Sequence, residues 1–173
     1  MWIVLGTLVL AVDGLSYPSL ENEFLRPHLT MLDRSLRQTA RRRLLPSDPA
    51  SVEDCRQLVL RDDLVVVSHD TQADPVFNFA NRAALEVFAM SWEQITSTAS
   101  RYSAEAPDRQ ERASLLQEVT THGFISDYSG IRIAADGRRF RIRGALVWNV
   151  YDDRGDAAGQ AAMFAVPDVE WLT

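Results

Sequence analysis

The sequence predicts an α+β fold, with a core built as a five-stranded antiparallel sheet with helices on one face, preceded by N-terminal helices. From residue 64 on, strand-like and helix-like patterns follow one another in the order β-β-α-α-α-β-β-β. Tight turn signals fall only between the last three strands, as an antiparallel sheet with its helices inserted after the second strand requires. A chain of 173 residues with 46% hydrophobic content supports one well-buried core.

Residues 1–19 form an apolar extension that we set apart from this fold. The run WIVLGTLVLAV at 2–12 is well short of the roughly 20 residues that span a bilayer. It also lacks the positive charge and the cleavage site of a signal peptide. Either a start codon assigned too far upstream, or a strand or helix that docks on the domain, would account for it.

Residues 20–62 are expected to form N-terminal helices. Leucines at helical spacing predict one amphipathic helix over 20–45. The leucines of this stripe are Leu25, Leu29, Leu32 and Leu36. Pro27 lies inside this segment, so we expect a break near Arg26 and a regular helix from His28 onward. His28 itself should lie on the helix surface.

A second, shorter helix is expected from Ser51, because Asp54 three residues later suits a helix cap. Four arginines lie near the end of the first helix, and they are Arg37, Arg41, Arg42 and Arg43. They complement the negative end of the helix dipole. An anionic partner such as nucleic acid is the alternative, but the net charge of −6 and the pI near 5.0 weaken it. We therefore expect no nucleic-acid partner.

Residues 63–173 should form the sheet and its own helices. The expected strands are 64–68, 75–79, 124–134, 139–151 and 160–166, and the expected helices are 81–89, 91–95 and 108–121. Asn81 is a good N-cap for the first of these helices. Phe77 and Phe79 alternate with polar Asn78, as expected of a half-buried strand.

Several phrases resemble the MEKHLA domain, a family related to PAS domains, and they are SHDTQADPVFNFANRAALEVFAMSW, SRYSAEAPDRQERASLL, GFISDYSGIRI, GRRFRIRGALVWNVYD and GQAAMF. They extend over nearly everything from Leu29 to Val166. The family occurs as small stand-alone bacterial proteins, the type that this chain resembles, and at the C-terminus of plant class III homeodomain leucine-zipper regulators. The resemblance implies a PAS-like fold and a sensory or interaction module. It brings no known ligand and no catalytic residues.

A PAS-like fold places a pocket between the sheet and the helices, lined by alternating residues of the last strands. On the strand from Phe140 we expect the even positions to face inward. The candidate ligand-pocket residues are Phe77, Phe79, Phe88, Trp92, Tyr128, Leu146, Trp148 and Phe164. Two interpretations stay open, a core filled by these rings and a ligand-sized cavity. A ladder of arginines is expected on the outer face, formed by Arg132, Arg139, Arg141 and Arg143.

Cofactor chemistry has few candidate residues. His122 lies roughly where haem-binding PAS relatives carry an axial ligand, although a loop histidine beside a glycine is more often exposed. Flavin could bind only non-covalently, because Cys55 precedes the first core strand and cannot form the adduct of light-sensing PAS domains. His69, Asp70 and Asp74 have the residue types of a metal site, but a polar strand end that fixes the loop explains them better. We expect no metal.

We expect a non-catalytic, stand-alone PAS-like sensory or protein-interaction module in the cytoplasm. A single cysteine suits a reducing compartment, and the absence of lysine excludes Schiff-base and P-loop chemistry. No output domain and no membrane span are expected, so the signal should pass through a partner protein or a homodimer formed along the N-terminal helix.

Two alternatives belong to other classes. One is a small-molecule-binding protein or enzyme of unknown substrate, with Arg101, Asp127 and Tyr128 as polar groups. No nucleophile–base pair, carboxylate pair or phosphate loop can be placed at a common site to support an enzyme. The other is an interaction module without a pocket, which the sequence does not separate from a sensor.

Overall fold

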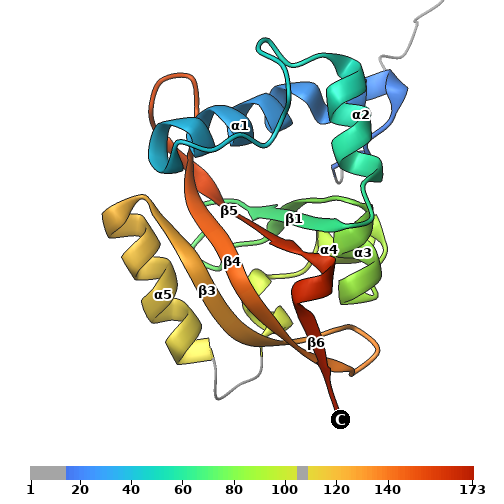
Figure 1. Ribbon diagram of the computed structural model, residues 1–173, viewed down its shortest axis with the longest axis vertical. Coiled ribbons are helices and arrows are strands. Elements are labelled where there is room, and N and C mark those ends of the chain that lie inside the picture. The colour runs from blue at the N-terminus through green and yellow to red at the C-terminus, as the bar shows by residue number, and fades with distance from the viewer. Residues whose placement is uncertain (1–14, 105–108) are drawn as a thin grey trace, which may run out of the picture.

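Within residues 15–104 and 109–173, which the computed structural model describes, six antiparallel strands form one sheet with helices on both faces (Figure 1). The strands are β1 (Leu64–His69), β2 (Phe77–Ala80), β3 (Phe124–Ile133), β4 (Arg139–Tyr151), β5 (Ala157–Ala165) and β6 (Val169–Leu172). The helices are α1 (Arg26–Ala40), α2 (Val52–Leu60), α3 (Arg82–Phe88), α4 (Trp92–Ile95) and α5 (Arg109–His122). Short 3₁₀ segments lie at Leu20–Leu25, Ser100–Ser103 and Val166–Asp168. The predicted α+β fold is confirmed.

The strands are ordered β2-β1-β5-β4-β3 across the sheet. β4 pairs with β5 along its C-terminal half and with β6 along its first four residues, from Arg139 to Ile142. The sequence did not predict β6, because a strand of four residues carries too little periodicity to be recognised. The chain that follows the predicted fifth strand therefore returns to the sheet.

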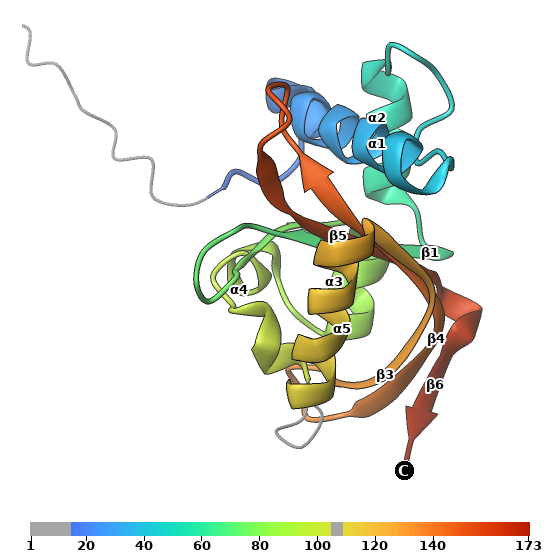
Figure 2. The same ribbon diagram turned by 90° about the vertical axis from the view of Figure 1, so that its left-hand side faces the viewer.

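Helices cover the two faces of the sheet in separate layers (Figure 2). α3 contacts β1, and α5 contacts β3 and β4, while α4 contacts the edge strand β2. α1 crosses β4 on the opposite face, with α2 beside it. We call the apolar cluster between the sheet and α3 and α5 the inner core, and the cluster beneath α1 and α2 the outer core. The N-terminal helices are thus the second cover of the sheet.

α1 buries its leucine stripe against the sheet. The helix begins at Arg26 with Pro27 in its first turn, which confirms the expected break. The leucines at the outer core are fully buried, and they are Leu29, Leu32 and Leu36. The helix ends at Ala40, earlier than predicted, because Arg41 adopts a left-handed conformation with φ of 57°.

The arginines near the end of α1 hold the following loop. Asp33 is buried, and its carboxylate accepts hydrogen bonds from the backbone N–H groups of Leu44 (2.6 Å) and Leu45 (3.0 Å). The Nε of Arg37 lies 3.4 Å from the same carboxylate. These charges therefore fix the turn after α1, which supports the structural interpretation of the arginine cluster.

β4 changes the face that its side chains present part-way along its length. Ile142 pairs with Gly130 of β3, and Ala145 pairs with Tyr128. Between these two pairs the chain advances three residues along β4 but only two along β3. The extra residue falls at Gly144, whose φ of 63° suits glycine. The residues at the inner core are Phe140, Ile142, Ala145 and Val147, and those at the outer core are Leu146, Trp148 and Val150. The expectation that all even positions share one face is wrong beyond this bulge.

A second bulge has the same effect on β2. Ser68 of β1 pairs with Phe79, and His69 pairs with Phe77, so Asn78 is the extra residue. Phe77 therefore contacts the inner core, and Phe79 contacts the outer core. β3 has a further register shift against β4 between Ile125 and Tyr128. Strand periodicity alone predicts none of these shifts, since it assumes an unbroken ladder.

The fully buried side chain of Asn81 joins three segments of the core. Its amide oxygen accepts hydrogen bonds from the backbone N–H of Ala84 (3.2 Å), as predicted for an N-cap, and from that of Val66 (3.0 Å). Its amide nitrogen donates to the carbonyl oxygens of Leu64 (2.7 Å) and Leu58 (3.3 Å). One side chain thus links the end of α2, strand β1 and the start of α3.

Replacing Asn81 by alanine should lower the free energy of unfolding by about 3 kcal/mol, because two N–H groups and two carbonyls lose their partners in a dry interior. Asn81→Asp should cost at least as much, since a carboxylate cannot donate to the two carbonyls. The control is Ser91→Ala, which removes an exposed N-cap and should cost about 1 kcal/mol. Urea unfolding measures all three. Equal losses for Asn81→Ala and Ser91→Ala would reduce Asn81 to an ordinary cap.

Candidate functional site

A cavity of about 70 Å³ lies within the inner core, between the curved sheet and the helices α3 and α5. Strands β1 to β5 all contribute to its wall. The residues that line it are Val67, Ser68, His69, Phe77, Phe88, Ser103, Val119, Ile125, Tyr128, Arg132, Ile142, Ala145, Val147, Gln160, Ala161, Ala162 and Phe164. This set contains no carboxylate.

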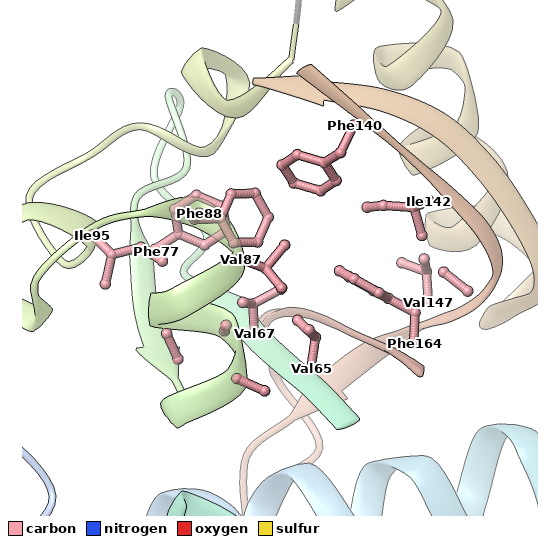
Figure 3. Close-up of a cluster of buried hydrophobic side chains, with 14 of the residues drawn as sticks. Val65, Val67, Phe77, Val87, Phe88, Ile95, Phe140, Ile142, Val147 and Phe164 are labelled. Carbon is pink, nitrogen blue, oxygen red and sulfur yellow. The ribbon is translucent and has the colours of Figure 1, made fainter. Parts of the chain in front are cut away.

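Most of the wall is apolar. Figure 3 shows Ile142, Val147 and Phe164 on the side of the sheet and Phe88 on the side of α3. The centroids of the Phe88 and Phe77 rings lie 6.2 Å apart. Phe88 also packs edge to face on Phe140 of β4, which does not line the cavity, at a centroid distance of 5.4 Å. Such a wall excludes water and favours an apolar occupant.

The polar end of the cavity is formed by Arg132 and Tyr128 of β3. The guanidinium of Arg132 is buried, with 7% of the residue exposed. Its Nη2 donates to the hydroxyl oxygen of Tyr128, and its Nη1 donates to the carbonyl oxygen of Ile131 (2.9 Å). The guanidinium also lies 5.2 Å from the centre of the Tyr128 ring, within the range of a cation–π contact.

Gly130 makes room for this pair. A Cβ atom at residue 130 would collide with the hydroxyl of Tyr128, lie 2.9 Å from its Cζ, and lie 3.2 Å from Nη1 of Arg132. The Tyr128 ring therefore lies over the backbone of its own strand at a position that only glycine permits. The order Tyr-x-Gly-x-Arg builds the polar end of the cavity from one strand.

A buried amide network holds α5 beside the cavity. Asn149 donates to the carbonyl oxygen of Val119 (2.9 Å) near the end of α5. Gln160 donates to Oδ1 of Asn149 (3.0 Å) and to the hydroxyl oxygen of Thr120 (3.2 Å). Because these side chains belong to β4 and β5, the helix that closes the cavity is tied to the strands that line it.

The structure divides the eight candidate pocket residues into two groups. The four that line the cavity are Phe77, Phe88, Tyr128 and Phe164. The four that belong to the outer core are Phe79, Trp92, Leu146 and Trp148. The bulges at Asn78 and Gly144 account for the positions of three of these four. Trp92 instead reaches the outer core from α4, where its ring meets Phe79 edge to face at 6.3 Å.

Sequence reasoning missed Arg132, which was expected on the outer face with three other arginines. Two members of that set do lie on the outside, where Arg141 (3.6 Å) and Arg143 (3.1 Å) contact Glu170 of β6. Arg132 differs because it lies two residues beyond Gly130 and four beyond Tyr128, on their side of the strand. That spacing was the available signal.

The other polar candidates lie apart from the cavity. Arg101 pairs with Asp74 at 3.0 Å, and Asp127 is exposed. His122 is exposed at the end of α5, with its Nδ1 3.1 Å from the carbonyl oxygen of Glu118.

His69 lines the cavity, and its Nδ1 lies 2.9 Å from the carbonyl oxygen of Asp70. The Asp70 carboxylate accepts from the N–H groups of Gln72 (3.2 Å) and Val76 (3.0 Å), and these bonds lower its pKa, although burial opposes them. This is the polar strand end that fixes a loop. The described part of the chain holds no group of three histidine, cysteine or acidic side chains that could bind a metal ion.

The profile of the MEKHLA domain matches residues 26–168, which is most of the chain. The chain belongs to the MEKHLA domain family. The homeobox-leucine zipper protein ATHB-9 of Arabidopsis thaliana is 27% identical to it over 92 residues, which are 53% of this chain and 11% of that protein. This MEKHLA domain therefore spans only a small part of the length of its curated relative.

Solved structures confirm the PAS fold of this MEKHLA domain. A PAS domain from Colwellia psychrerythraea superposes with a TM-score of 0.52 at 15% identity, over 64% of this chain and 86% of that one. A light-oxygen-voltage domain studied with a flavin analogue gives 0.51 at 11% identity, over 70% and 84% of the two chains. The Rhodobacter sphaeroides LOV protein gives 0.51 at 14% identity, over 62% of each chain. At these identities the likeness concerns the fold alone.

The cavity does not fit a flavin or a haem. It measures about 70 Å³, whereas pockets for ligands of such size measure roughly 300–1,000 Å³. Cys55 is buried in the outer core, away from the cavity wall, and burial raises the pKa of its thiol to about 11. The MEKHLA domain thus offers neither the space nor the thiolate of a photochemical flavin site.

His28 is a half-buried residue of α1 that contacts the sheet, so the expectation of a surface histidine is wrong. Its Nε2 lies 3.0 Å from the hydroxyl oxygen of Ser68, and its ring centre lies 5.9 Å from that of Phe79. Burial lowers the pKa of His28 from 6.5 to about 4. The neutral imidazole is therefore part of the contact between α1 and the sheet.

The free energy of unfolding should fall as the pH drops from 6.5 towards 4, because in this range His28 is protonated in the unfolded chain and neutral in the folded chain. The loss has an upper bound of about 3 kcal/mol, reduced by partial exposure. In His28→Gln this part of the pH dependence should vanish. Urea unfolding at pH 7, 5.5 and 4.5 measures it, with exposed His122→Gln as the control. A pH dependence that His28→Gln leaves unchanged would contradict the assignment.

Gly130→Ala should destabilise the fold by about 1–3 kcal/mol, because the added methyl group must displace the Tyr128 ring or the Arg132 guanidinium. In a Tyr128→Ala background the same change should cost much less, since its main collision is removed. Ser129→Ala, at the exposed neighbouring position, is the control. Thermal unfolding of the four variants completes the cycle. Equal costs in both backgrounds would show that the Tyr128 contact is not the constraint.

Proposed function

We propose that this MEKHLA domain is a sensory module whose input is the occupancy of the cavity in its inner core. The observation that carries the proposal is a cavity whose wall combines the sheet with α3 and α5. Filling it changes contacts between these layers. The family match and the PAS fold support a sensory or interaction role for the chain.

The sheet offers a short route from the cavity to the N-terminal helices. On β4, Val147 faces the cavity and Trp148 faces α1. The indole Nε1 of Trp148 donates to the carbonyl oxygen of Leu32 in α1 at 3.2 Å. A shift of β4 therefore reaches α1 through adjacent residues. We propose that the outer surface of α1 passes the signal to a partner protein.

The leucine stripe of α1 does not supply a dimer surface in this arrangement. Leu29 and Leu32 have no exposed surface, because the sheet already covers them. A homodimer or a partner protein would have to use the polar side of the helix instead. We propose a non-catalytic role, which the absence of carboxylates among the described residues of the cavity wall supports. The buried thiol of Cys55 suits the reducing cytoplasm in which we place the protein.

A second candidate function is an interaction module that uses no ligand. The small volume of the cavity favours it, since an engineered cavity that admits benzene measures about 150 Å³. In that case the aromatic rings serve packing alone.

Among residues 15–104 and 109–173, no helix combines the length and the apolar character needed to cross a membrane.

Xenon under pressure, followed by methyl NMR, tests the proposal in the whole chain. The methyl signals of Ile142 and Val147 should shift, and hydrogen exchange in α1 should change. Ala145→Leu should abolish both effects while the fold remains, because the leucine side chain fills the cavity from β4. The control is Ala113→Leu at an exposed position of α5. Absence of any xenon effect in the wild-type protein favours the interaction module, and an effect that survives Ala145→Leu contradicts the assigned cavity.

A further inference from the structure

Arg132 carries a buried charge whose hydrogen-bond partners, among the described residues, are neutral groups. The residue is 7% exposed and is the only arginine among the buried residues of the described chain. Its hydrogen-bond partners there are the carbonyl oxygen of Ile131 and the hydroxyl of Tyr128. Among the side chains that the structure describes, no carboxylate forms an ion pair with it, and none lines the cavity at which it stands.

Several other arginines of the described chain are more exposed and lie close to a carboxylate. Arg101 contacts Asp74 and Arg141 contacts Glu170, and both pairs are well exposed. A second hollow of about 530 Å³, near α2, contains Arg43 and Arg61, but these contact Asp33 (3.9 Å) and Asp63 (2.5 Å). Within the described part of the chain, a cation that is buried and has no acidic partner is thus found at the inner cavity alone.

Such a charge is costly to maintain. An arginine cannot release its proton at any ordinary pH, so burial cannot neutralise it. Removing a charge from water without a counter-ion costs several kcal/mol. The guanidinium presents five N–H groups in a planar fork, and the protein occupies one on Nη1 and one on Nη2. An anion with two oxygen atoms matches the remaining donors and supplies the missing charge.

Tyr128 adds a second donor at the same place. Its hydroxyl oxygen accepts from Arg132, so its own proton remains to be donated to an anion. Gly130 holds the two side chains together, as described above.

The rest of the wall selects the anion. Although Ser68, His69, Ser103 and Gln160 also reach it, most of it is apolar, which disfavours a polyanion or a polar body. The apolar part includes Phe77, Phe88, Ile142 and Phe164. The volume of about 70 Å³ is near half of the cavity that admits benzene, which leaves room for roughly three or four carbon atoms. We propose that this cavity binds a small monocarboxylate, with its carboxylate on Arg132 and Tyr128 and a short apolar tail among the phenylalanines. The inference rests on the proposed sensory function and names its ligand class.

Butyrate and its neutral isostere butyramide are the probes, titrated into the whole chain and followed by methyl NMR of Ile142 and Val147. Butyrate should bind at least about tenfold more tightly, because the charge-assisted bonds to Arg132 are absent in the amide. Arg132→Gln should weaken butyrate by about tenfold or more and leave butyramide within about threefold. Tyr128→Phe should weaken butyrate by a smaller factor. Arg141→Gln, on the outer face, is the matched control and should change neither.

The outcomes separate the two proposals. If xenon enters the cavity but butyramide binds as well as butyrate, the carboxylate assignment is overturned and the sensory cavity stands. Tighter binding of inorganic phosphate than of butyrate also overturns it. If neither xenon nor any probe shifts the cavity signals, the proposed function fails together with its ligand. Should Arg132→Gln not fold, the comparison of butyrate with butyramide in the wild-type protein decides the matter alone.

Discussion

One extra residue in β4 determines what each face of the sheet can do. Because the chain gains a step at Gly144, the first half of the strand turns Phe140 towards the inner core, and the second half turns Trp148 towards α1. In an unbroken strand both rings would lie on one side. The large indole would then compete for the space of the cavity, and the N-terminal helix would lose its main contact on the sheet. The cavity and the helix cover therefore depend on the same backbone irregularity.

Local chemistry made much of the fold predictable. Asn81 and Ser51 begin helices by caps that involve neighbours within three residues, so the sequence window contains the whole signal. Pro27 fixes the start of α1 in the same way. The order of strands and helices, joined by glycine turns, was enough for the antiparallel sheet. Each of these features is decided by residues close together in the chain.

The cavity wall was less predictable, because facing direction is a non-local property. The rule that alternate residues of a strand share one face fails beyond a bulge. It therefore placed Leu146 and Trp148 on the inner side, whereas they lie in the outer core. His28 was misplaced for a related reason, since nothing near it in sequence shows that Ser68 will lie against it. Arg132 was grouped by charge with its outward-facing neighbours, although its spacing from Tyr128 pointed inward. The first error comes from treating a strand as regular, the second from a contact between residues far apart in the chain, and the third from grouping a residue by charge instead of by its spacing.

The same irregularities affect how readily the sheet of one molecule could pair with the sheet of another. β2 and β3 end the main strand order of the sheet, and an edge strand exposes backbone groups that another chain could pair with. β2 is only four residues long and is bulged at Asn78. β3 is long, but its two register shifts against β4 interrupt the straight row of hydrogen-bonding groups that a second sheet would need. The bulges that direct side chains inward thus also protect these two edge strands against pairing with another sheet.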